Sequence, residues 1–347
     1  TELRNQYFPF NLYFFDGQGQ ELVTDRRWLF SRRETLPSAL ISLIMEGPSQ
    51  RLQPAVASIL PAGASYTGFE DGAYTFSGFG GVSEQDRTRF AAQVVWTLAS
   101  AGISGPFTLE ADGAPLITGT PTLTTDDFGE LSPLVQTAGE ATLYALNDGS
   151  ISLIDGGSLT PLDNELGKEG SVITADITAS GRWVAVFGAG GGEASLRAGA
   201  FGEESRELVT ASTFTRPSFE SNAAAVWTVA DGTRILRSVQ SAATGDVNTE
   251  EIVAELPEGV SGNISVLRLS RSGARVVMVI DGHLYTGIVE RRAPGERAIV
   301  NVVEYAAELG GSVVSADWQP DGSLIVGTSV SVSPVLRVEQ DLSLIHI

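Results

Sequence analysis

The 347-residue sequence contains no cysteine, one lysine and two histidines. The missing cysteine excludes disulfides, zinc held by thiolates and a thiol nucleophile. It also lacks long hydrophobic runs: a helix that spans a bilayer needs about 20 apolar residues, and no segment approaches that length. We therefore expect no transmembrane helix, and the residue types present predict no metal, no cofactor and no catalytic set.

Positive charge is also scarce, because 22 basic residues face 42 acidic ones and the formal net charge is −20. Nucleic acids and anionic membrane surfaces both require a cationic face on the protein that binds them. The charge balance therefore argues against nucleic acid as a partner, and against direct contact with a membrane surface.

The first third of the chain, residues 1–118, has the pattern of a small α+β domain. A stripe of apolar residues at helical spacing is stopped by Gly47-Pro48 and predicts the first helix; its members are Leu36, Leu40, Leu43 and Ile44. Ser83, with Asp86 three residues later, forms a capping-box pattern that starts a second helix over residues 84–100. Asp-Gly pairs such as Asp71-Gly72 predict tight hairpins. We expect two helices with five or six antiparallel strands.

Residues 119–130 are polar and rich in threonine and aspartate, which is typical of a linker. Asp126-Asp127 lies within this stretch. Calcium needs more oxygen ligands at set intervals than these two residues supply, so solvation of the linker explains the pair better than a cation site does.

Residues 131–347 repeat a pattern of apolar strand, small polar turn and very apolar strand. Aligned positions 181, 223, 273 and 322 are 42, 50 and 49 residues apart, which is the length of a four-stranded propeller blade. A β-sandwich is the alternative, but it has no reason to repeat this unit at a nearly fixed interval. The pattern predicts an all-β propeller-like domain of one partial blade, three whole blades and the start of another. Residues 342–347 show no turn signal and no partner strand, which suggests a truncated C-terminus.

Several residues in the second domain could carry chemistry. The glycine run from Gly188 to Gly192 follows a strand, but a dinucleotide site needs a helix next, so a blade hairpin is the better interpretation. The only histidines are His283, in a hairpin, and His346, near the end. A Ser–His–Asp arrangement stays open, although a lone turn histidine is usually a surface residue. The predicted inner strands offer four charged residues and no histidine: Asp176, Glu220, Arg268 and Asp317.

Four arginines concentrate within eight positions of the first domain, beside two aromatic residues. Arginine and aromatic residues together are enriched at the energetic centres of protein interfaces. We therefore predict a partner-binding surface, with a solvated cationic strand face as the alternative. The residues predicted to bind the partner are Arg26, Arg27, Trp28, Arg32 and Arg33.

The first domain resembles the GerMN module in the order and spacing of its motifs. They are the Tyr13-Phe-Phe-Asp-Gly strand and turn, the helix Ala39-Leu-Ile-Ser-Leu-Ile-Met-Glu-Gly-Pro, the run Ile59-Leu-Pro-Ala-Gly-Ala, the hairpin at Glu70-Asp-Gly and the helix Ala92-Gln-Val-Val-Trp-Thr-Leu. One departure is Tyr74-Thr-Phe-Ser-Gly, where the family has a segment like Asp-Leu-Ser. A GerMN module followed by a propeller looks like the actinobacterial lipoprotein LpqB family.

This resemblance implies an exported, non-enzymatic lipoprotein. The lipid anchor is expected upstream of Thr1, so the membrane would be reached only through that anchor. The resemblance also implies association with the extracytoplasmic domain of a sensor histidine kinase of the MtrAB system, in cell-envelope and division signalling. The alternative is a propeller enzyme or ligand sensor that holds a small molecule or glycan in its central channel.

Overall fold

The computed structural model describes residues 7–346 apart from 31, 134–141, 169, 189–191, 222–224, 242–243, 294, 308, 310, 333 and 341–343. For residues 344–346 it describes the backbone alone. The chain divides into two units, Thr1–Gln136 and Thr137–Ile347. Among the described residues, the first unit is α+β and the second is all-β apart from one helical turn. The two fold classes are as the sequence predicts, and the helical turn was not predicted.

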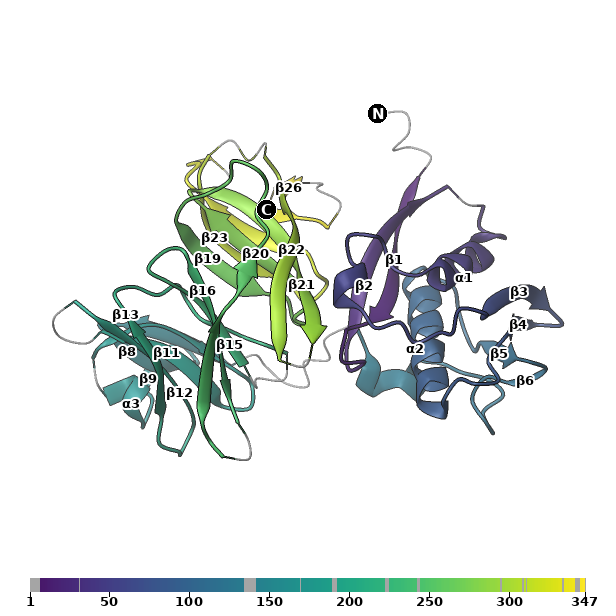
Figure 1. Ribbon diagram of the computed structural model, residues 1–347, viewed down its shortest axis with the longest axis horizontal. Coiled ribbons are helices and arrows are strands. Elements are labelled where there is room, and N and C mark those ends of the chain that lie inside the picture. The colour runs from purple at the N-terminus through teal and green to yellow at the C-terminus, as the bar shows by residue number, and fades with distance from the viewer. Residues whose placement is uncertain are drawn as a thin grey trace. The chain divides into compact units, whose positions relative to one another are not determined.

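The described part of the first unit holds two α-helices, a hairpin β1–β2 and a sheet of order β3-β4-β5-β6 (Figure 1). Strands β4 and β5 are parallel, which corrects the expectation of antiparallel strands throughout. Helix α2 joins them, and a crossover of this kind gives parallel neighbours. The elements are β1 (Phe8–Phe15), β2 (Leu22–Leu29), α1 (Leu36–Glu46), η2 (Gln53–Ala55), β3 (Ser65–Glu70), β4 (Ala73–Ser77), α2 (Glu84–Ser100), β5 (Thr108–Ala111), β6 (Ala114–Pro115) and η3 (Thr125–Leu131).

The local signals read from the sequence define the ends of these elements. The Ser83 hydroxyl oxygen accepts a hydrogen bond from the backbone N–H of Asp86 at 3.1 Å, so it caps α2 as predicted. Asp71 and Gly72 both have positive φ, at 50° and 84°, which the tight β3–β4 turn requires. The capping and hairpin predictions are therefore confirmed.

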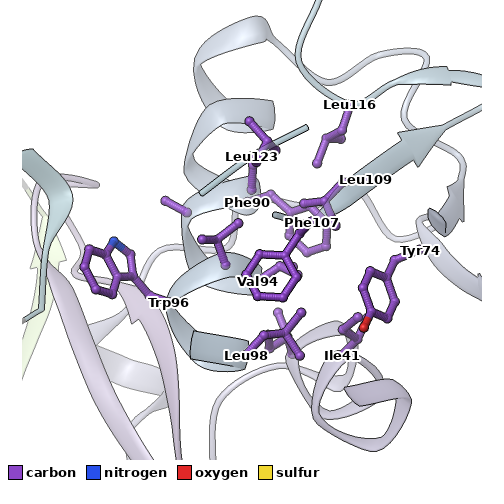
Figure 2. Packing of buried hydrophobic residues seen from close by; sticks show 14 of the residues in the cluster. Ile41, Tyr74, Phe90, Val94, Trp96, Leu98, Phe107, Leu109, Leu116 and Leu123 are labelled. Atoms are coloured by element: carbon purple, nitrogen blue, oxygen red, sulfur yellow. The ribbon is translucent and has the colours of Figure 1, made fainter. Parts of the chain in front are cut away.

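Helix α2 forms the centre of the core, with Phe90, Val94 and Leu98 fully buried. Figure 2 shows Trp96 extending to one side of α2 while Phe107 and several leucines lie on the other. Because side chains pack on both sides of α2, this helix holds the surrounding elements of the first unit in place.

Residues 119–131 differ from the linker expectation, because they pack on this core. Leu123 and Phe128 are 1% and 3% exposed. The Trp96 indole donates a hydrogen bond to the Phe128 carbonyl at 3.3 Å. Asp127 accepts from the backbone N–H of Thr124 at 2.7 Å and so caps η3. The two apolar residues hold this polar stretch against α2, and Asp127 acts as a cap.

The second unit is a succession of sheets with one helical turn, α3 (Glu165–Lys168). Its described residues form a three-stranded sheet, β7–β9, and then four sheets of four or five strands. The strands are β7 (Leu143–Asn147), β8 (Ser150–Asp155), β9 (Ser158–Pro161), β10 (Val172–Ile177), β11 (Arg182–Gly188), β12 (Ala194–Ala200), β13 (Arg206–Ala211), β14 (Ser218–Phe219), β15 (Ala225–Ala230), β16 (Arg234–Gln240), β17 (Val247–Glu251), β18 (Val253–Ala254), β19 (Ile264–Leu269), β20 (Arg275–Ile280), β21 (His283–Ala293), β22 (Glu296–Glu304), β23 (Val313–Trp318), β24 (Leu324–Thr328), β25 (Val335–Val338) and β26 (Leu344–His346).

Three of the junctions between successive sheets share the same backbone contact. In three sheets an Asp-Gly turn places both residues at positive φ. The glycine carbonyl of each turn accepts a hydrogen bond from the N–H that begins the first main strand of a following sheet. These bonds are Val172 to Gly149 at 2.9 Å, Ile264 to Gly232 at 2.7 Å and Val313 to Gly282 at 2.8 Å. The same main-chain joint therefore connects successive sheets of the propeller-like region at these three places.

Two details of the second unit differ from the sequence expectation. The end of the chain was expected to lack a partner strand, but β26 pairs antiparallel with β25, so that expectation is wrong. The sheet that contains β19–β22 gains a fifth strand, because β18 adds in parallel to β22. Both pairings join segments whose sequence contains no turn signal.

Candidate functional site

The two-residue period of β2 divides the predicted arginine surface between two faces. Trp28 lies opposite Pro9 and Arg26 opposite Asn11, whereas Arg27 lies opposite Phe10. Successive side chains of a strand point to opposite faces, so Arg26 and Trp28 share one face and Arg27 lies on the other. The five residues predicted from the sequence therefore do not form one surface.

Arg27 has a structural role. Its Nε donates to the Asp25 carboxylate at 2.9 Å, and its Nη2 donates to the Gly47 carbonyl at 3.3 Å. Asp25 is 5% exposed and also accepts from the backbone N–H of Ser49 at 2.7 Å. The Arg27–Asp25 pair thus ties β2 to the end of α1, and the Arg27 charge is matched within the fold.

The face of Arg26 and Trp28 continues into an exposed aromatic cluster. Trp28 is 40% exposed and Phe30 is 66% exposed. Tyr7 lies beside Phe30, with ring centroids 6.0 Å apart, and is 38% exposed. Arg32 and Arg33 follow in the exposed loop. We call this surface the aromatic–arginine patch: Tyr7, Arg26, Trp28, Phe30, Arg32 and Arg33. Tyr7 was missed in the sequence, and the signal that could have found it is the hairpin register.

A second cluster of charges joins the inner strands of three sheets. The Arg268 side chain lies 3.3 Å from Asp176 and 3.4 Å from Asp317, and it also donates to the Pro217 carbonyl. Arg216 contacts the same two aspartates, at 3.2 and 3.6 Å. Two guanidinium groups therefore balance two carboxylates. The structure brings together three of the four inner-strand residues named from the sequence.

The fourth, Glu220, belongs to a separate buried network. One oxygen of its carboxylate accepts from the Trp227 indole at 2.9 Å and from Arg237 Nε at 2.7 Å. Arg237 also donates to Glu250 at 2.9 Å and to the Gly295 carbonyl at 3.3 Å. Burial alone would raise the pKa of Glu220, but the hydrogen bond and charge of Arg237 outweigh it and lower the pKa.

This lowered pKa predicts acid sensitivity of the second unit. A carboxylate whose folded pKa is depressed contributes stability above its unfolded pKa, and that contribution is lost as the pH falls through the folded pKa. Glu220→Gln removes the charge, so we expect it to destabilise the protein at pH 7. The difference in the free energy of unfolding between the variant and the unmodified protein should become smaller below about pH 4. Urea unfolding at pH 7 and below pH 4 measures this difference in free energy. A difference that does not change with pH would contradict the lowered pKa of Glu220.

The remaining sequence candidates have ordinary structural roles or lie outside the described residues. His283 is exposed, with Nδ1 3.0 Å from the Glu304 carboxylate. Gly188 ends β11 and the next described element is the strand β12, so no helix follows to hold a phosphate; residues 189–191 and the His346 side chain are not described. Among the described residues, no three His, Asp or Glu side chains gather as a metal site would. In the same residues, no helix is long and apolar enough to cross a membrane.

Family comparisons match both units. The family described as "Lipoprotein LpqB beta-propeller domain" matches residues 149–346, and the family described as "Sporulation and spore germination" matches residues 11–117. Lipoprotein LpqB of Corynebacterium diphtheriae is 40% identical over 99% of this chain and 61% of its own length. The proteins of the same name from Corynebacterium jeikeium and Mycobacterium tuberculosis are 33% and 31% identical, over 95% and 98% of this chain and 58% and 62% of their own lengths. The chain thus spans about three fifths of these relatives.

Solved structures resemble the chain more distantly. The β-propeller domain of Cps50 (Swd1) from Myceliophteria thermophila is 16% identical, with a TM-score of 0.40, and the match covers 59% of this chain and 68% of that chain. A gluconolactonase from Xanthomonas campestris is 9% identical, with a TM-score of 0.40, over 54% of this chain and 65% of that chain.

Proposed function

Because the chain belongs to the LpqB lipoprotein family, we propose that it acts outside the cytoplasm, attached to the membrane by lipid, as a non-enzymatic interaction module. Its proposed partner is the extracytoplasmic domain of a sensor histidine kinase of the MtrAB type. In this role it regulates cell-envelope and division signalling by binding the sensor domain. The relatives' name supports the lipid attachment, and the aromatic–arginine patch supports the interaction.

The patch carries this proposal because it departs from the rest of the chain. A protein with a formal charge of −20 places Arg26, Arg32 and Arg33 next to exposed aromatic rings. Arginine forms paired hydrogen bonds with carboxylates, and the neighbouring rings supply apolar area that loses water on contact. A sensor-domain surface that presents acidic residues around an apolar centre would complement this patch. Charge of this kind mainly accelerates association, so binding should weaken as salt rises.

The charge cluster of the inner strands supports a role without catalysis. A catalytic carboxylate usually has partners that leave it able to exchange protons with a substrate. Asp176 and Asp317 each contact both Arg216 and Arg268. Such pairing matches the charges of the carboxylates and joins segments of different sheets. The arrangement therefore suits cohesion of the propeller-like region better than acid–base chemistry.

The test replaces Arg26, Arg32 and Arg33 by serine and leaves Arg27 intact. Arg32 and Arg33 are exposed and Arg26 is half-buried. Exposed arginines contribute little to stability, so most of the fold should be retained, and circular dichroism of the variant checks this. We expect its affinity for the purified sensor domain to fall several-fold at low salt, and the difference from the unmodified chain to shrink at high salt. Biolayer interferometry at two salt concentrations measures both effects.

A matched control replaces two exposed arginines of the second unit, Arg182 and Arg234, by serine. This control should bind as the unmodified chain does. A second variant, Trp28→Ala with Phe30→Ala, should weaken binding at both salt concentrations, because the lost contact is apolar. Equal affinity of all variants would place the binding surface elsewhere on the chain.

A further inference from the structure

The first unit contains a pocket of about 450 Å³ that the proposed function does not use. This volume lies in the range of small-molecule pockets. Three side-chain amides, one hydroxyl and one guanidinium surround it, and a leucine supplies the apolar part. The lining residues are Gln18, Gly19, Gln20, Gln85, Thr88, Arg89 and Leu131.

The loop that forms one wall is held in place by a single buried carboxylate. Asp16 is 1% exposed. Its oxygens accept hydrogen bonds from the backbone N–H groups of Gln20 at 2.7 Å, Glu21 at 3.0 Å and Gln18 at 3.3 Å. The N–H of Gly17 donates to the Ala55 carbonyl at 2.9 Å. The amides of Gln18 and Gln20 therefore extend from a fixed backbone, which lowers the entropy lost when a ligand binds.

Arg89 also lines the pocket, and its guanidinium lies against Gly19. Gly19 has φ of +67°, and a Cβ placed there would lie 2.8 Å from Cζ of Arg89. The guanidinium lies over the Phe15 ring, with Cζ 5.9 Å from the ring centre, and contacts Asp86 at 3.0 Å. Glycine thus leaves room for the Arg89 guanidinium against the loop, and Asp86 matches its charge.

From this arrangement we propose that the pocket binds a neutral carbohydrate. An amide presents a donor and an acceptor side by side, which matches neighbouring sugar hydroxyls that both donate and accept. Thr88 donates its proton to the Glu84 carbonyl at 2.9 Å, so its oxygen can still accept a hydrogen bond from a hydroxyl. The Arg89 charge is already matched and the chain is strongly acidic, so an anionic ligand gains little here and is repelled at long range.

The experiment is isothermal titration calorimetry of the 347-residue chain with three tetrasaccharides. Two are neutral, maltotetraose and the N-acetylglucosamine tetramer, and one is anionic, tetragalacturonate. We expect measurable binding of at least one neutral probe and weaker or no binding of the anionic one. No heat with either neutral probe, or tighter binding of tetragalacturonate, would overturn the proposal.

Variants locate the binding in the pocket. Gln20→Ala with Gln85→Ala removes two amides from exposed positions and should weaken neutral-probe binding about tenfold. The control pair Gln53→Ala with Gln240→Ala removes two exposed amides elsewhere and should leave affinity unchanged. Gly19→Ala should also weaken binding, because it displaces the Arg89 guanidinium without removing a hydrogen-bonding group. Equal affinity of the pocket pair and the control pair would overturn the assignment.

Discussion

Replacing Glu220 by alanine is expected to destabilise the second unit by about 3–5 kcal/mol, because it leaves a buried guanidinium without its closest partner. Glu220 and Arg237 are both 6% exposed and are joined at 2.7 Å. The variant also removes the acceptor of the Trp227 indole N–H, which is buried. An unpaired buried donor costs about 1–3 kcal/mol in desolvation, so we expect the loss of stability to lie toward the upper end of the range given above.

Urea unfolding followed by tryptophan fluorescence measures this change, because Trp183 and Trp227 are buried in the second unit. The control is Glu251→Ala, which removes a glutamate whose side chain is 60% exposed and which contacts Arg234. Exposed pairs contribute about 0–1 kcal/mol, so the control should stay close to the unmodified chain. A loss for Glu220→Ala as small as that of the control would mean that the network does not hold these sheets together.

Leu40→Ala is expected to destabilise the first unit by about 2–5 kcal/mol. Leu40 is fully buried in the cluster that surrounds α2, on the face that α1 presents to it. Truncating the side chain removes apolar contacts and leaves a cavity, since neighbouring elements relax only in part. The second unit should be unaffected if the two units unfold separately.

Differential scanning calorimetry measures this effect as a shift of one transition. The control is Leu159→Ala, the same chemical change at a side chain that is 56% exposed in the second unit. A surface truncation of this kind should change stability by about 0.5 kcal/mol or less. A loss for Leu40→Ala no larger than the control would place α1 at the surface, against the packing described above.

Much of the fold could be predicted from the sequence, because residues close together in the chain determine where helices and hairpins begin and end. The signals that predict the ends of α1 and α2 and the hairpins involve residues no more than four positions apart. They are Ser83 with Asp86, Gly47-Pro48 and the Asp-Gly turns. The even spacing of the repeat predicted the sheets of the second unit. What could not be predicted depends on contacts between distant segments. Leu123 and Phe128 look like isolated apolar residues in a polar stretch until α2 lies beside them.

The candidate surface, too, could be predicted from the sequence only in part. Composition alone identified a group of arginines around Trp28, but composition does not separate the two faces of a strand. The register of β1 against β2 assigns Arg27 to a structural contact and adds Tyr7 to the patch. In the second unit, Asp176, Arg268 and Asp317 were recognisable as charged residues of inner strands. Arg268 contacts Asp176 and Asp317, which lie 92 and 49 positions away in the chain, and only the folded chain shows these contacts.

The joint between sheets in the second unit bears on how this region can change during evolution. The hydrogen bonds that Gly149, Gly232 and Gly282 accept from the following strands involve main-chain atoms on both sides. Every residue except proline can supply such an N–H group, so the hydrogen bond itself does not select the strand residue, which burial limits to an apolar side chain, whereas the positive φ of the turn favours glycine. Blades that arose by duplication could therefore lose almost all of their mutual likeness and keep only their length and their turns. That history would leave the trace seen in this sequence, a strand–turn–strand unit that recurs at a nearly fixed interval while its strands otherwise share little.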